Sequence, residues 1–523
     1  MDGHAPRILL CDCAGSFAPD GAAIEAATGL APAPVASRLC TAEAGRLADA
    51  LRAAEAEGSE VVVACAQMAE TFAEIAAELD LPAPLSVDIR DRAGWTDAAS
   101  AARTGPKQAA LLAAARLPAH ETPVMDVESA GLCLVLASTE TGAEAAARLA
   151  ETLSVTVLST DGEAPVEAPA GWDLARGRVR SAAGALGSFT LSVDGYAPLE
   201  PAGRGTQGFG RAADGAQTGC DIVVDLRGGP ALFPAPEKRD GYLRADPADP
   251  IAVTRAIAAA RELVGTVEKT LHVRTEPALC AHKRAGKTGC TRCLSVCPTG
   301  AITVASGDAV EAVTLDPAIC AGCGACAAVC PSGAILADDP AVEPLFRQLR
   351  VMADAWALAG ATEPPRLLVH DDSHGAEMIR LAARHGDGLP ADVIPLETRA
   401  LTAFGHAEML VALALGYGEV TVLLGPRADR AVIEAEQALA EAVLAATGDA
   451  APRLRLVDPA EPDALAEVLR GPVPAPTGVE PIMAAGGRRD GTRLAATALA
   501  TAGGRALPED PLPLPEGAPY GAV

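Results

Sequence analysis

The fold of the middle of this chain is decided by the stretch CAGCGACAAVCP at 320–331. A second stretch, CAHKRAGKTGCTRCLSVCP at 280–298, repeats its second half with the same spacing, Cys-x2-Cys-x3-Cys-Pro. Both runs continue as Pro-(Thr/Ser)-Gly-Ala-Ile, so the two halves form an internal repeat. Eight of the 14 cysteines lie between Cys280 and Cys330, and none follows Cys330.

Thiols with this spacing are suited to iron–sulfur clusters. A [4Fe–4S] cube needs four thiolates that converge from different directions, and three closely spaced cysteines on one loop supply three of them. The fourth cysteine of each run lies past a turn and reaches the other cluster. Gly322 and Gly324 allow the backbone to wrap a cube, and Pro298 and Pro331 end the loops. We therefore predict cluster I at Cys280, Cys290, Cys293 and Cys330, and cluster II at Cys320, Cys323, Cys326 and Cys297.

Two structural zinc sites are the alternative, because CxxC pairs also bind zinc. Two complete four-cysteine runs, each closed by Pro, argue against zinc. The nine residues after Cys280 depart from the usual spacing and carry a basic loop. This loop could raise the potential of cluster I or dock an acidic redox partner, and a solvated surface loop is the alternative. The basic residues of this loop and its surroundings are His282, Lys283, Arg284, Lys287 and Arg292.

The module resembles the bacterial-type 2[4Fe–4S] ferredoxin family over about 60 residues. That resemblance implies two [4Fe–4S] clusters in a small α+β fold. The flanks on both sides are α/β in pattern, so we expect open parallel sheets that flank an inserted ferredoxin-like module.

Composition excludes several classes of function. Acidic residues outnumber basic ones by 68 to 42, for a net charge of −26, which disfavours nucleic acid and anionic membranes as partners. The chain lacks an apolar run long enough to span a membrane, and its N-terminus does not read as a signal peptide. We expect a cytoplasmic protein, because a reducing compartment favours metal over disulfide at clustered cysteines.

The N-terminal region carries four more cysteines in an α/β pattern. Cys11 and Cys65 each close an expected buried strand, and we expect Cys40 to close another, PVASRLC. The carboxyl ends of parallel strands share one crevice, so these thiols and Cys13 could meet there; inert, buried cysteines are the alternative. CDCAG at 11–15, VVVACAQMAETFAEIAAELDL and DIRDRAGW resemble the N-terminal region of the heterodisulfide reductase A family. The resemblance implies a third iron–sulfur cluster at Cys11, Cys13, Cys40 and Cys65, although a further cysteine of that family is Ala93 here.

In the heterodisulfide reductase A family the next domain binds a flavin through a glycine-rich turn. Here the matching place, LVLASTETGAEAAARLAETLSVTVLS, keeps only Gly142. Without the other glycines a pyrophosphate cannot approach the backbone, so we expect neither flavin nor NAD. GRGTQG at 203–208 matches the G-x-G-x-x-G fingerprint, but it lies between two loops, so we interpret it as a chance match. Cys133 and Cys220 lie in or beside expected strands and are read as core packing.

The stretch from LLVHDDSHGAEM to ALALGYGEVTVLLGP resembles the delta subunit of methyl-viologen-reducing hydrogenase, whose cysteines are absent here. The resemblance implies that this region keeps the shape with which the resembled subunit docks but has lost its iron–sulfur cluster. We expect His370 and His374 to be unliganded in an exposed loop, with metal binding as the alternative. The ending GAPYGAV indicates a truncated form.

These patterns predict a multidomain α/β chain that transfers electrons. We expect a subunit or carrier of a larger oxidoreductase system that meets redox partner proteins, and not a stand-alone enzyme. A flavin-dependent disulfide-type reductase and a scaffold with structural clusters are the alternatives. The predicted segments are a heterodisulfide-reductase-A-like α/β domain at 1–118, a degenerate nucleotide-binding-like α/β domain at 121–275, the ferredoxin domain at 276–340, a linker helix at 341–363, a hydrogenase-delta-like α/β domain at 364–472 and a Pro/Gly-rich tail at 473–523.

Overall fold

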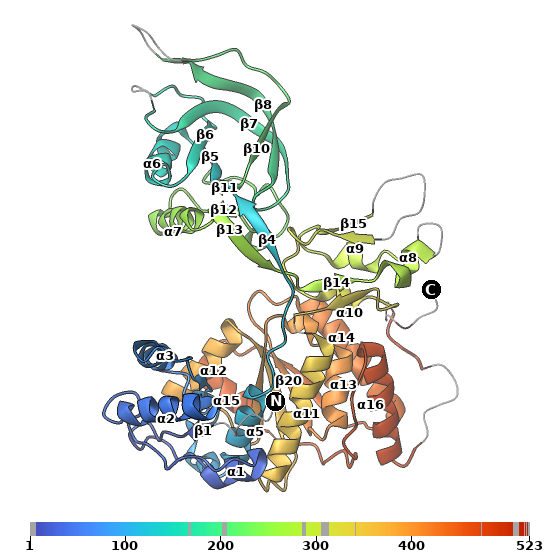
Figure 1. The fold of residues 1–523 in the computed structure, drawn as a ribbon. Coiled ribbons are helices and arrows are strands. Elements are labelled where there is room, and N and C mark those ends of the chain that lie inside the picture. The colour runs from blue at the N-terminus through green and yellow to red at the C-terminus, as the bar shows by residue number, and fades with distance from the viewer. Residues whose placement is uncertain are drawn as a thin grey trace. The chain divides into compact units, whose positions relative to one another are not determined.

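The chain is a mixed α/β protein with several parallel sheets (Figure 1). It divides into two compact units, one made of Met1–Glu121 with Pro340–Ala522 and the other of Thr122–Asp339. Within the described part of the chain, no helix combines the length and apolarity needed to cross a membrane. The computed structural model describes residues 7–165, 169–200, 207–284, 289–304, 313–339, 341–471, 473–505, 512–516, 518 and 520.

The first sheet of the unit made of Met1–Glu121 and Pro340–Ala522 is small and parallel, with strand order β1-β2-β3. Its central strand comes from EVVVAC, a run of β-branched residues that suits a strand buried on both faces. All three residues of that strand are buried. The strands are β1 (Arg7–Leu9), β2 (Val61–Val63) and β3 (Leu85–Ser86), and the helices are α1 (Gly21–Thr28), α2 (Ala44–Glu57), α3 (Ala69–Glu78), η1 (Arg90–Gly94), α4 (Ala98–Ala101) and α5 (Gly105–Ala115).

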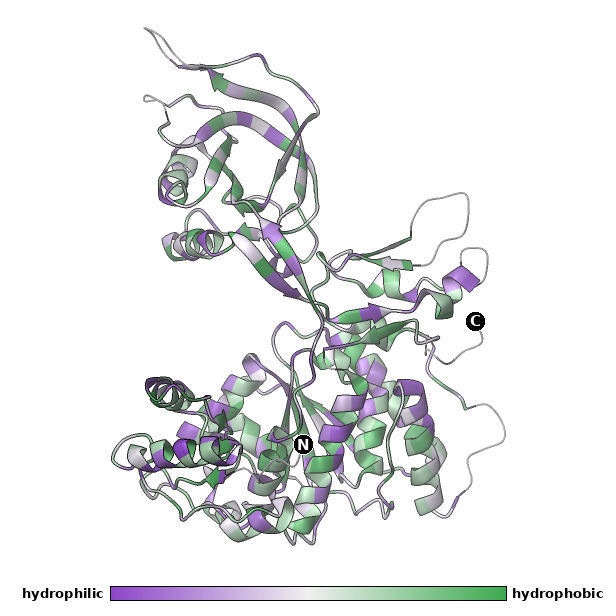
Figure 2. Ribbon diagram, viewed as in Figure 1, coloured by the Kyte–Doolittle hydropathy of each residue, from purple (hydrophilic) through white to green (hydrophobic). Residues whose placement is uncertain are grey.

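The second sheet of this unit has four parallel strands in the order β19-β18-β20-β21. The helix α13 is apolar on nearly every side and is buried at every residue, as an all-round apolar helix must be (Figure 2). The strands are β18 (Arg366–Asp371), β19 (Val393–Thr398), β20 (Glu419–Leu423) and β21 (Leu454–Val457), and the helices are α12 (His374–His385), η4 (Leu401–Ala403), α13 (His406–Ala414), α14 (Arg430–Thr447), α15 (Pro462–Leu469) and α16 (Arg488–Ala502).

The two segments of this unit, far apart in sequence, share one hydrophobic core. The helix α11 (Val342–Leu358), which lies where the linker helix is expected, buries Leu345 and Leu349. Those side chains belong to the same cluster as Ile24 and Leu112 of the N-terminal segment. Because α11 packs directly on α5, this helix is a structural part of the unit.

A buried lysine also joins the two segments. Lys107 of α5 is fully buried, and its Nζ donates to the carbonyl oxygens of Leu389 at 3.3 Å and Pro390 at 2.8 Å. Burial lowers the pKa of Lys107 to about 7, with Asp392 and Asp97 opposing that shift and Arg366 adding to it. Folding therefore either deprotonates the Lys107 ammonium or buries it in charged form at a cost in free energy.

We expect the stability of this unit to rise between pH 7 and pH 9 because of Lys107. The folded-state pKa lies below the ordinary value of 10.5, so unfolding takes up a proton in this range. At about 1.4 kcal/mol per pH unit, the gain is on the order of 2 kcal/mol. Urea midpoints followed by circular dichroism at both pH values would measure it, and Lys107→Met should lose the increment. An equal rise in that variant would contradict the prediction, while Lys238→Met on the other unit serves as the control.

The unit of residues 122–339 contains an eight-stranded mixed sheet with the main order β10-β8-β7-β6-β5-β11-β12. The strands β7 and β8 pair as an antiparallel hairpin, and the turn between them contains Gly184 and Gly187. Gly184 has φ +93°, and a Cβ there would lie 2.2 Å from the Ser188 carbonyl oxygen, so this turn requires glycine. The elements are β5 (Leu132–Ala137), α6 (Thr139–Leu149), β6 (Ser154–Ser159), β7 (Asp173–Ala183), β8 (Phe189–Glu200), β9 (Gly208–Phe209), β10 (Ala216–Cys220), β11 (Ile222–Asp225), η2 (Pro236–Lys238), β12 (Tyr242–Arg244) and α7 (Pro250–Arg261).

The cysteine-rich module follows this sheet and consists of short strands and short helices. Two antiparallel pairs, β14 with β17 and β15 with β16, carry the two copies of the Gly-Ala-Ile sequence. A separate antiparallel pair, β4 with β13, flanks the sheet. The elements are β4 (Val124–Ser129), β13 (Gly265–Thr270), β14 (Val273–Thr275), η3 (Pro277–Leu279), α8 (Ala281–Arg284), α9 (Arg292–Val296), β15 (Ile302–Val304), β16 (Val313–Leu315), α10 (Ala325–Ala328) and β17 (Ile335–Ala337).

Candidate metal centres

The two cysteine runs of the module place their thiols on similar local structures. Cys293 lies within α9 and Cys326 within α10. Cys297 follows α9 directly and Cys330 follows α10 after Val329, each before a proline. The chain enters α10 through Gly324, whose φ is +76°. A left-handed residue at this point lets the loop turn back around its own cysteines.

Four of the predicted ligands line one cavity. Cys280, Cys290 and Cys293 of the first run and Cys330 of the second run all face it. Burial, together with the nearby Cys330, Cys290 and Cys280 thiols, raises the pKa of the Cys293 thiol to about 11. The structure thus brings together the four cysteines of predicted cluster I. The apolar part of the wall includes Val313, Val329, Ala334 and Ile335.

The other four predicted ligands also lie close together. Burial raises the pKa of the Cys326 thiol, and Cys323, Cys320 and Cys297 act on it in the same direction. Burial likewise raises the pKa of Cys320, to which Cys323 and Cys297 add. Because Cys297 comes from the first run, the two runs exchange their last cysteines. The module core packs around these thiols with Val273, Ile302 and Ile335.

A set of four partly buried thiols with an apolar wall is the donor set that a [4Fe–4S] cluster uses. A single zinc ion instead needs four ligands at about 2.0–2.3 Å from one centre. Among the residues that the structure describes, no three His, Cys, Asp or Glu side chains are grouped so as to hold a metal ion.

Residues 288–334 match the family model of the 4Fe-4S dicluster domain. Seven of the eight predicted ligands lie inside this match, and Cys280 precedes it. A search of curated proteins finds no match to the chain. The dicluster domain supports iron–sulfur electron transfer as the chemistry of this module.

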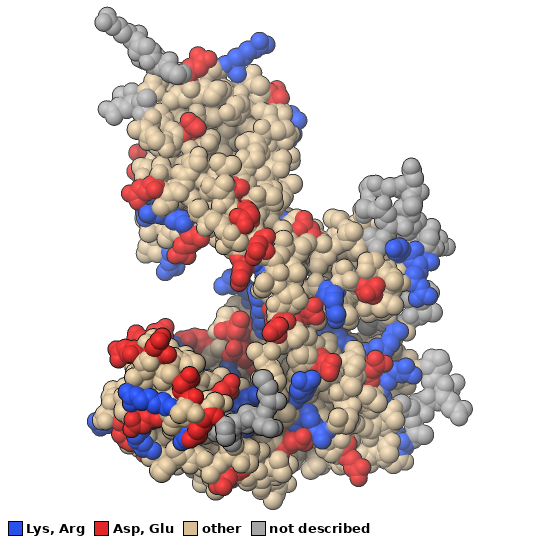
Figure 3. All heavy atoms as spheres, in the orientation of Figure 1, with Lys and Arg blue, Asp and Glu red and all other residues tan. Residues whose placement is uncertain are grey.

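The basic loop of the dicluster domain is only partly a surface feature. Lys283 and Arg284 are exposed at the end of α8, where basic side chains gather (Figure 3). His282, expected among them, is buried, and its Nδ1 lies 3.2 Å from the Cys290 carbonyl oxygen. The expectation of a surface role for His282 is therefore wrong, because its ring holds the cysteine loop from inside. Lys287 lies outside the described residues.

The four N-terminal cysteines line a second cavity. Cys11, Cys13, Cys40 and Cys65 all face a space of about 410 Å³ beside the carboxyl ends of β1 and β2. Burial raises the pKa of Cys65, which the backbone N–H groups of Met68 and Gln67 and the charge of Arg90 oppose. The remaining wall includes Phe17, Met68, Phe72 and Arg90. Ala93, at the position of the resembled family's further cysteine, is buried in the core.

The expectation that Cys40 closes a strand is wrong. Only Ala36 pairs with the sheet, through a single bridge to Cys11, and the chain then turns. The Glu43 carboxylate accepts from the backbone N–H groups of Ser37 at 2.7 Å and Arg38 at 3.2 Å. This side chain competes with strand pairing, and the resulting turn carries Cys40 to the cavity.

The loop that carries Cys13 is strained, and a buried arginine contacts it. Cys13 and Ala14 have φ of +50° and +60°, a region that non-glycine residues rarely adopt. Arg90 Nη1 donates to Cys13 Sγ at 3.4 Å. Sequence reasoning used DIRDRAGW only for its resemblance and missed this residue. The available signal was that Arg90 is the first Lys or Arg after Arg52 in the sequence.

The place where the heterodisulfide reductase A family binds flavin has a different arrangement here. The N-terminus of α6 is met by the Asp161 carboxylate, which accepts from Thr139 N at 3.0 Å and from Ser159 Oγ at 2.6 Å. Burial alone would raise the pKa of Asp161, but hydrogen bonds from Ser159, Thr139 and backbone N–H groups lower it to about 2. A Cβ on Gly142 would lie 2.5 Å from Val157, so this glycine serves helix–strand packing. The Asp161 carboxylate thus occupies the helix N-terminus at which a pyrophosphate would bind.

The remaining predicted residues are also placed. His370 is fully buried in β18, and its Nδ1 lies 2.8 Å from the Asp371 carbonyl oxygen; only His374, at the start of α12, is partly exposed. The expectation of an exposed loop for His370 is therefore wrong, because β18 extends through it. Cys133 and Cys220 are buried, as expected, and burial raises each pKa to about 12. GRGTQG lies largely outside the described residues.

Proposed function

We propose that this protein relays electrons through two [4Fe–4S] clusters in the dicluster domain and a third at the N-terminal cavity. The observation that carries the proposal is the grouping of the cysteines into two four-thiol sets that exchange their last members. Cys280, Cys290, Cys293 and Cys330 would hold cluster I, and Cys320, Cys323, Cys326 and Cys297 would hold cluster II. Each such cluster takes up and returns one electron.

The residues around the thiols support this role. Apolar side chains line much of the first cavity, and such a shell tunes the potential of a bound cluster together with nearby hydrogen bonds. Cys11, Cys13, Cys40 and Cys65 would hold the third cluster, because they supply the same donor set around a larger cavity.

We propose further that the chain acts as a component or carrier of a larger oxidoreductase system in the cytoplasm. The resemblance of the flanking sequences to heterodisulfide reductase A and the hydrogenase delta subunit, inferred from sequence motifs, supports this role, because both resembled proteins are subunits. All 14 cysteines are free of disulfides, as a reducing compartment would keep them.

A flavin-dependent reductase is the competing function, and Asp161 argues against it. A flavin pyrophosphate at α6 would meet a carboxylate that three protein groups already hold ionised. Like charges at that separation repel strongly in a partly buried site. A flavin spectrum in the purified protein would restore this competing function.

We expect about twelve irons per chain in anaerobically purified protein, and reduction by dithionite should give EPR signals from all three clusters. Replacing both Cys11 and Cys13 with Ala should lower the content to about eight irons, because a cube does not persist on two thiolates. Cys133→Ala, which removes a core thiol, should leave the content at about twelve. Clusters that dithionite cannot reduce would refute the relay and support the structural scaffold.

A further inference from the structure

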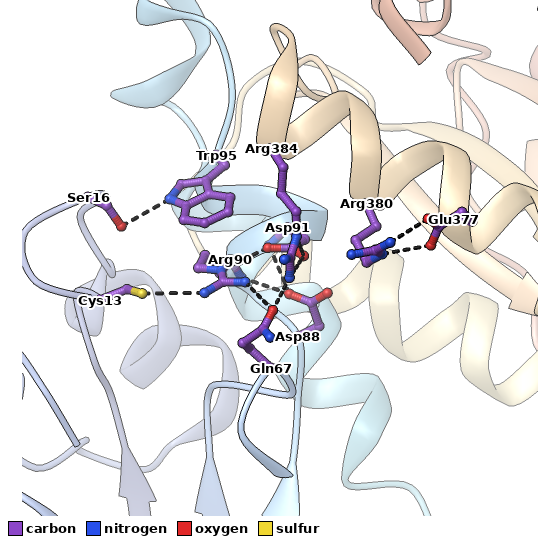
Figure 4. Close-up of polar contacts among 10 residues, drawn as sticks. All are labelled: Cys13, Ser16, Gln67, Asp88, Arg90, Asp91, Trp95, Glu377, Arg380 and Arg384. Atoms are coloured by element: carbon purple, nitrogen blue, oxygen red, sulfur yellow. Dashed lines mark hydrogen bonds and ion pairs between the residues drawn. The ribbon is translucent and has the colours of Figure 1, made fainter. Parts of the chain in front are cut away.

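The strongest unassigned feature is a buried polar network beside the N-terminal cavity (Figure 4). Arg90 lines the cavity, is 7% exposed and uses three sides of its guanidinium at once. Its Nε donates to Asp91 at 2.8 Å, its Nη2 to Gln67 at 2.8 Å and its Nη1 to Cys13 Sγ at 3.4 Å. A buried arginine with a donor aimed at a thiol is unusual, because burial of a charge is costly unless it is fully paired.

Aromatic packing holds this guanidinium in position. Arg90 lies over the Trp95 ring at 4.0 Å from its centroid, as planar arginine side chains favour. Trp95 Nε1 in turn donates to Ser16 Oγ at 3.0 Å, which ties the ring to the loop that follows Cys13. The Asp88 carboxylate accepts from the backbone N–H groups of Arg90 and Asp91 and so holds the turn that carries Arg90.

The network continues into the C-terminal segment. Arg384 of α12 donates to Asp91 Oδ2 through Nε at 3.1 Å and through Nη2 at 3.0 Å, and it also contacts Gln67. Asp91 therefore binds Arg90 with one oxygen and Arg384 with the other. Both acceptors that orient Arg90 are shared with Arg384, so the C-terminal segment completes the support of the arginine that faces Cys13.

We propose that Arg90 sets the reduction potential of the cluster held by Cys11, Cys13, Cys40 and Cys65, and that Arg384 positions Arg90 for this task. The inference rests on the proposed third cluster. Reduction adds one electron, supplied by a low-potential iron–sulfur donor, and no bond is made or broken. The reduced form carries one more negative charge, which spreads onto the Cys13 sulfur. A guanidinium that keeps its proton binds that form more tightly, so it raises the potential.

The test is a redox titration of the full-length protein, followed by EPR under anaerobic conditions. The signal of the third cluster is the one missing from Cys13→Ala. Arg90→Gln should lower the ratio of reduced to oxidised cluster about tenfold at a given potential, a shift of about 59 mV to more negative values for one electron. Arg90→Lys keeps the charge but loses the forked geometry, and its midpoint should lie between those of the wild type and Arg90→Gln.

Arg384 has a matched control on the same helix. Arg380 is 44% exposed and pairs with Glu377, so Arg380→Gln removes the same charge from α12 without touching the network. Arg384→Gln should shift the midpoint in the same direction as Arg90→Gln, and Arg380→Gln should leave it unchanged.

An unchanged midpoint in Arg90→Gln with about twelve irons retained would overturn the inference and leave the third cluster in place. About eight irons in the wild type would instead overturn the third cluster, and the inference with it. If Arg90→Gln loses iron, its midpoint cannot be compared with that of the wild type, and the test is made with Arg384→Gln and Arg380→Gln. Equal midpoint potentials in these two variants would overturn the inference.

Discussion

We expect Cys330→Ala to remove the cluster held by Cys280, Cys290 and Cys293, although Cys330 belongs to the other run. Cys330 lines the same cavity as those three thiols, and Cys330 contributes to the raised pKa of Cys293. Three thiolates cannot complete a four-iron cube, so iron content should fall by up to about four per chain. Iron analysis and EPR of the reduced protein would measure the loss.

Comparison with other variants identifies which cluster is lost. The EPR signal that survives in Cys330→Ala should equal that of Cys290→Ala, because both changes affect one cavity. Cys297→Ala should instead match Cys323→Ala, since Cys297 lies with the second set. If Cys330→Ala matched Cys323→Ala, each run would hold its own cluster, and the exchange of last cysteines would be wrong.

We expect Gly322→Ala to remove cluster II, with a loss of iron nearly as large as that expected for Cys330→Ala. Gly322 has φ +72°, and a Cβ there would lie 2.5 Å from the His272 ring. His272 is buried and pairs with Asp339 at 3.0 Å, so the ring has little room to move. The loop between Cys320 and Cys323 must then shift away, and a ligand misplaced by about 1 Å no longer completes the site.

Gly300→Ala is the matched control for this prediction. Gly300 follows another expected cluster II ligand, Cys297, and has φ +68°, but a Cβ there would meet nothing within 4 Å. The Gly300→Ala variant therefore has the cost of about 1–2 kcal/mol for a non-glycine residue in the left-handed region, but its Cβ collides with nothing. Gly300→Ala should keep the cluster II signal while Gly322→Ala loses it. Equal retention in both variants would show that the contact with His272 does not control the loop.

Local patterns predicted much of the fold, because they reflect the backbone's own periodicity. The buried strands expected before Cys11 and Cys65 became β1 and β2, and the helix expected at 341–363 became α11. Each of these depends on side chains only a few positions apart. The pairing of α11 with α5 depends on contacts between residues more than 200 positions apart, which no local pattern encodes.

The candidate sites divide in the same way. Cysteine spacing identified the dicluster domain, because a cube constrains the sequence distance between its ligands. The expected strand ending at Cys40 was wrong, since hydrogen bonds to the Glu43 side chain turn the chain there, although Cys40 still lines the cavity. The expected exposed loop at His370 was also wrong, because a longer strand buries this residue.

The sequence by itself thus determined the strand and helix alternation and the iron–sulfur character of the middle of the chain. Both depend on residues that are neighbours along the backbone. Only the tertiary structure decided that Cys11, Cys13, Cys40 and Cys65 line one cavity, and that Arg90 and Arg384 meet across Asp91 beside it. Those contacts join α12 to the turn at Arg90 about 300 positions earlier, and they exist because one hydrophobic core unites the two segments.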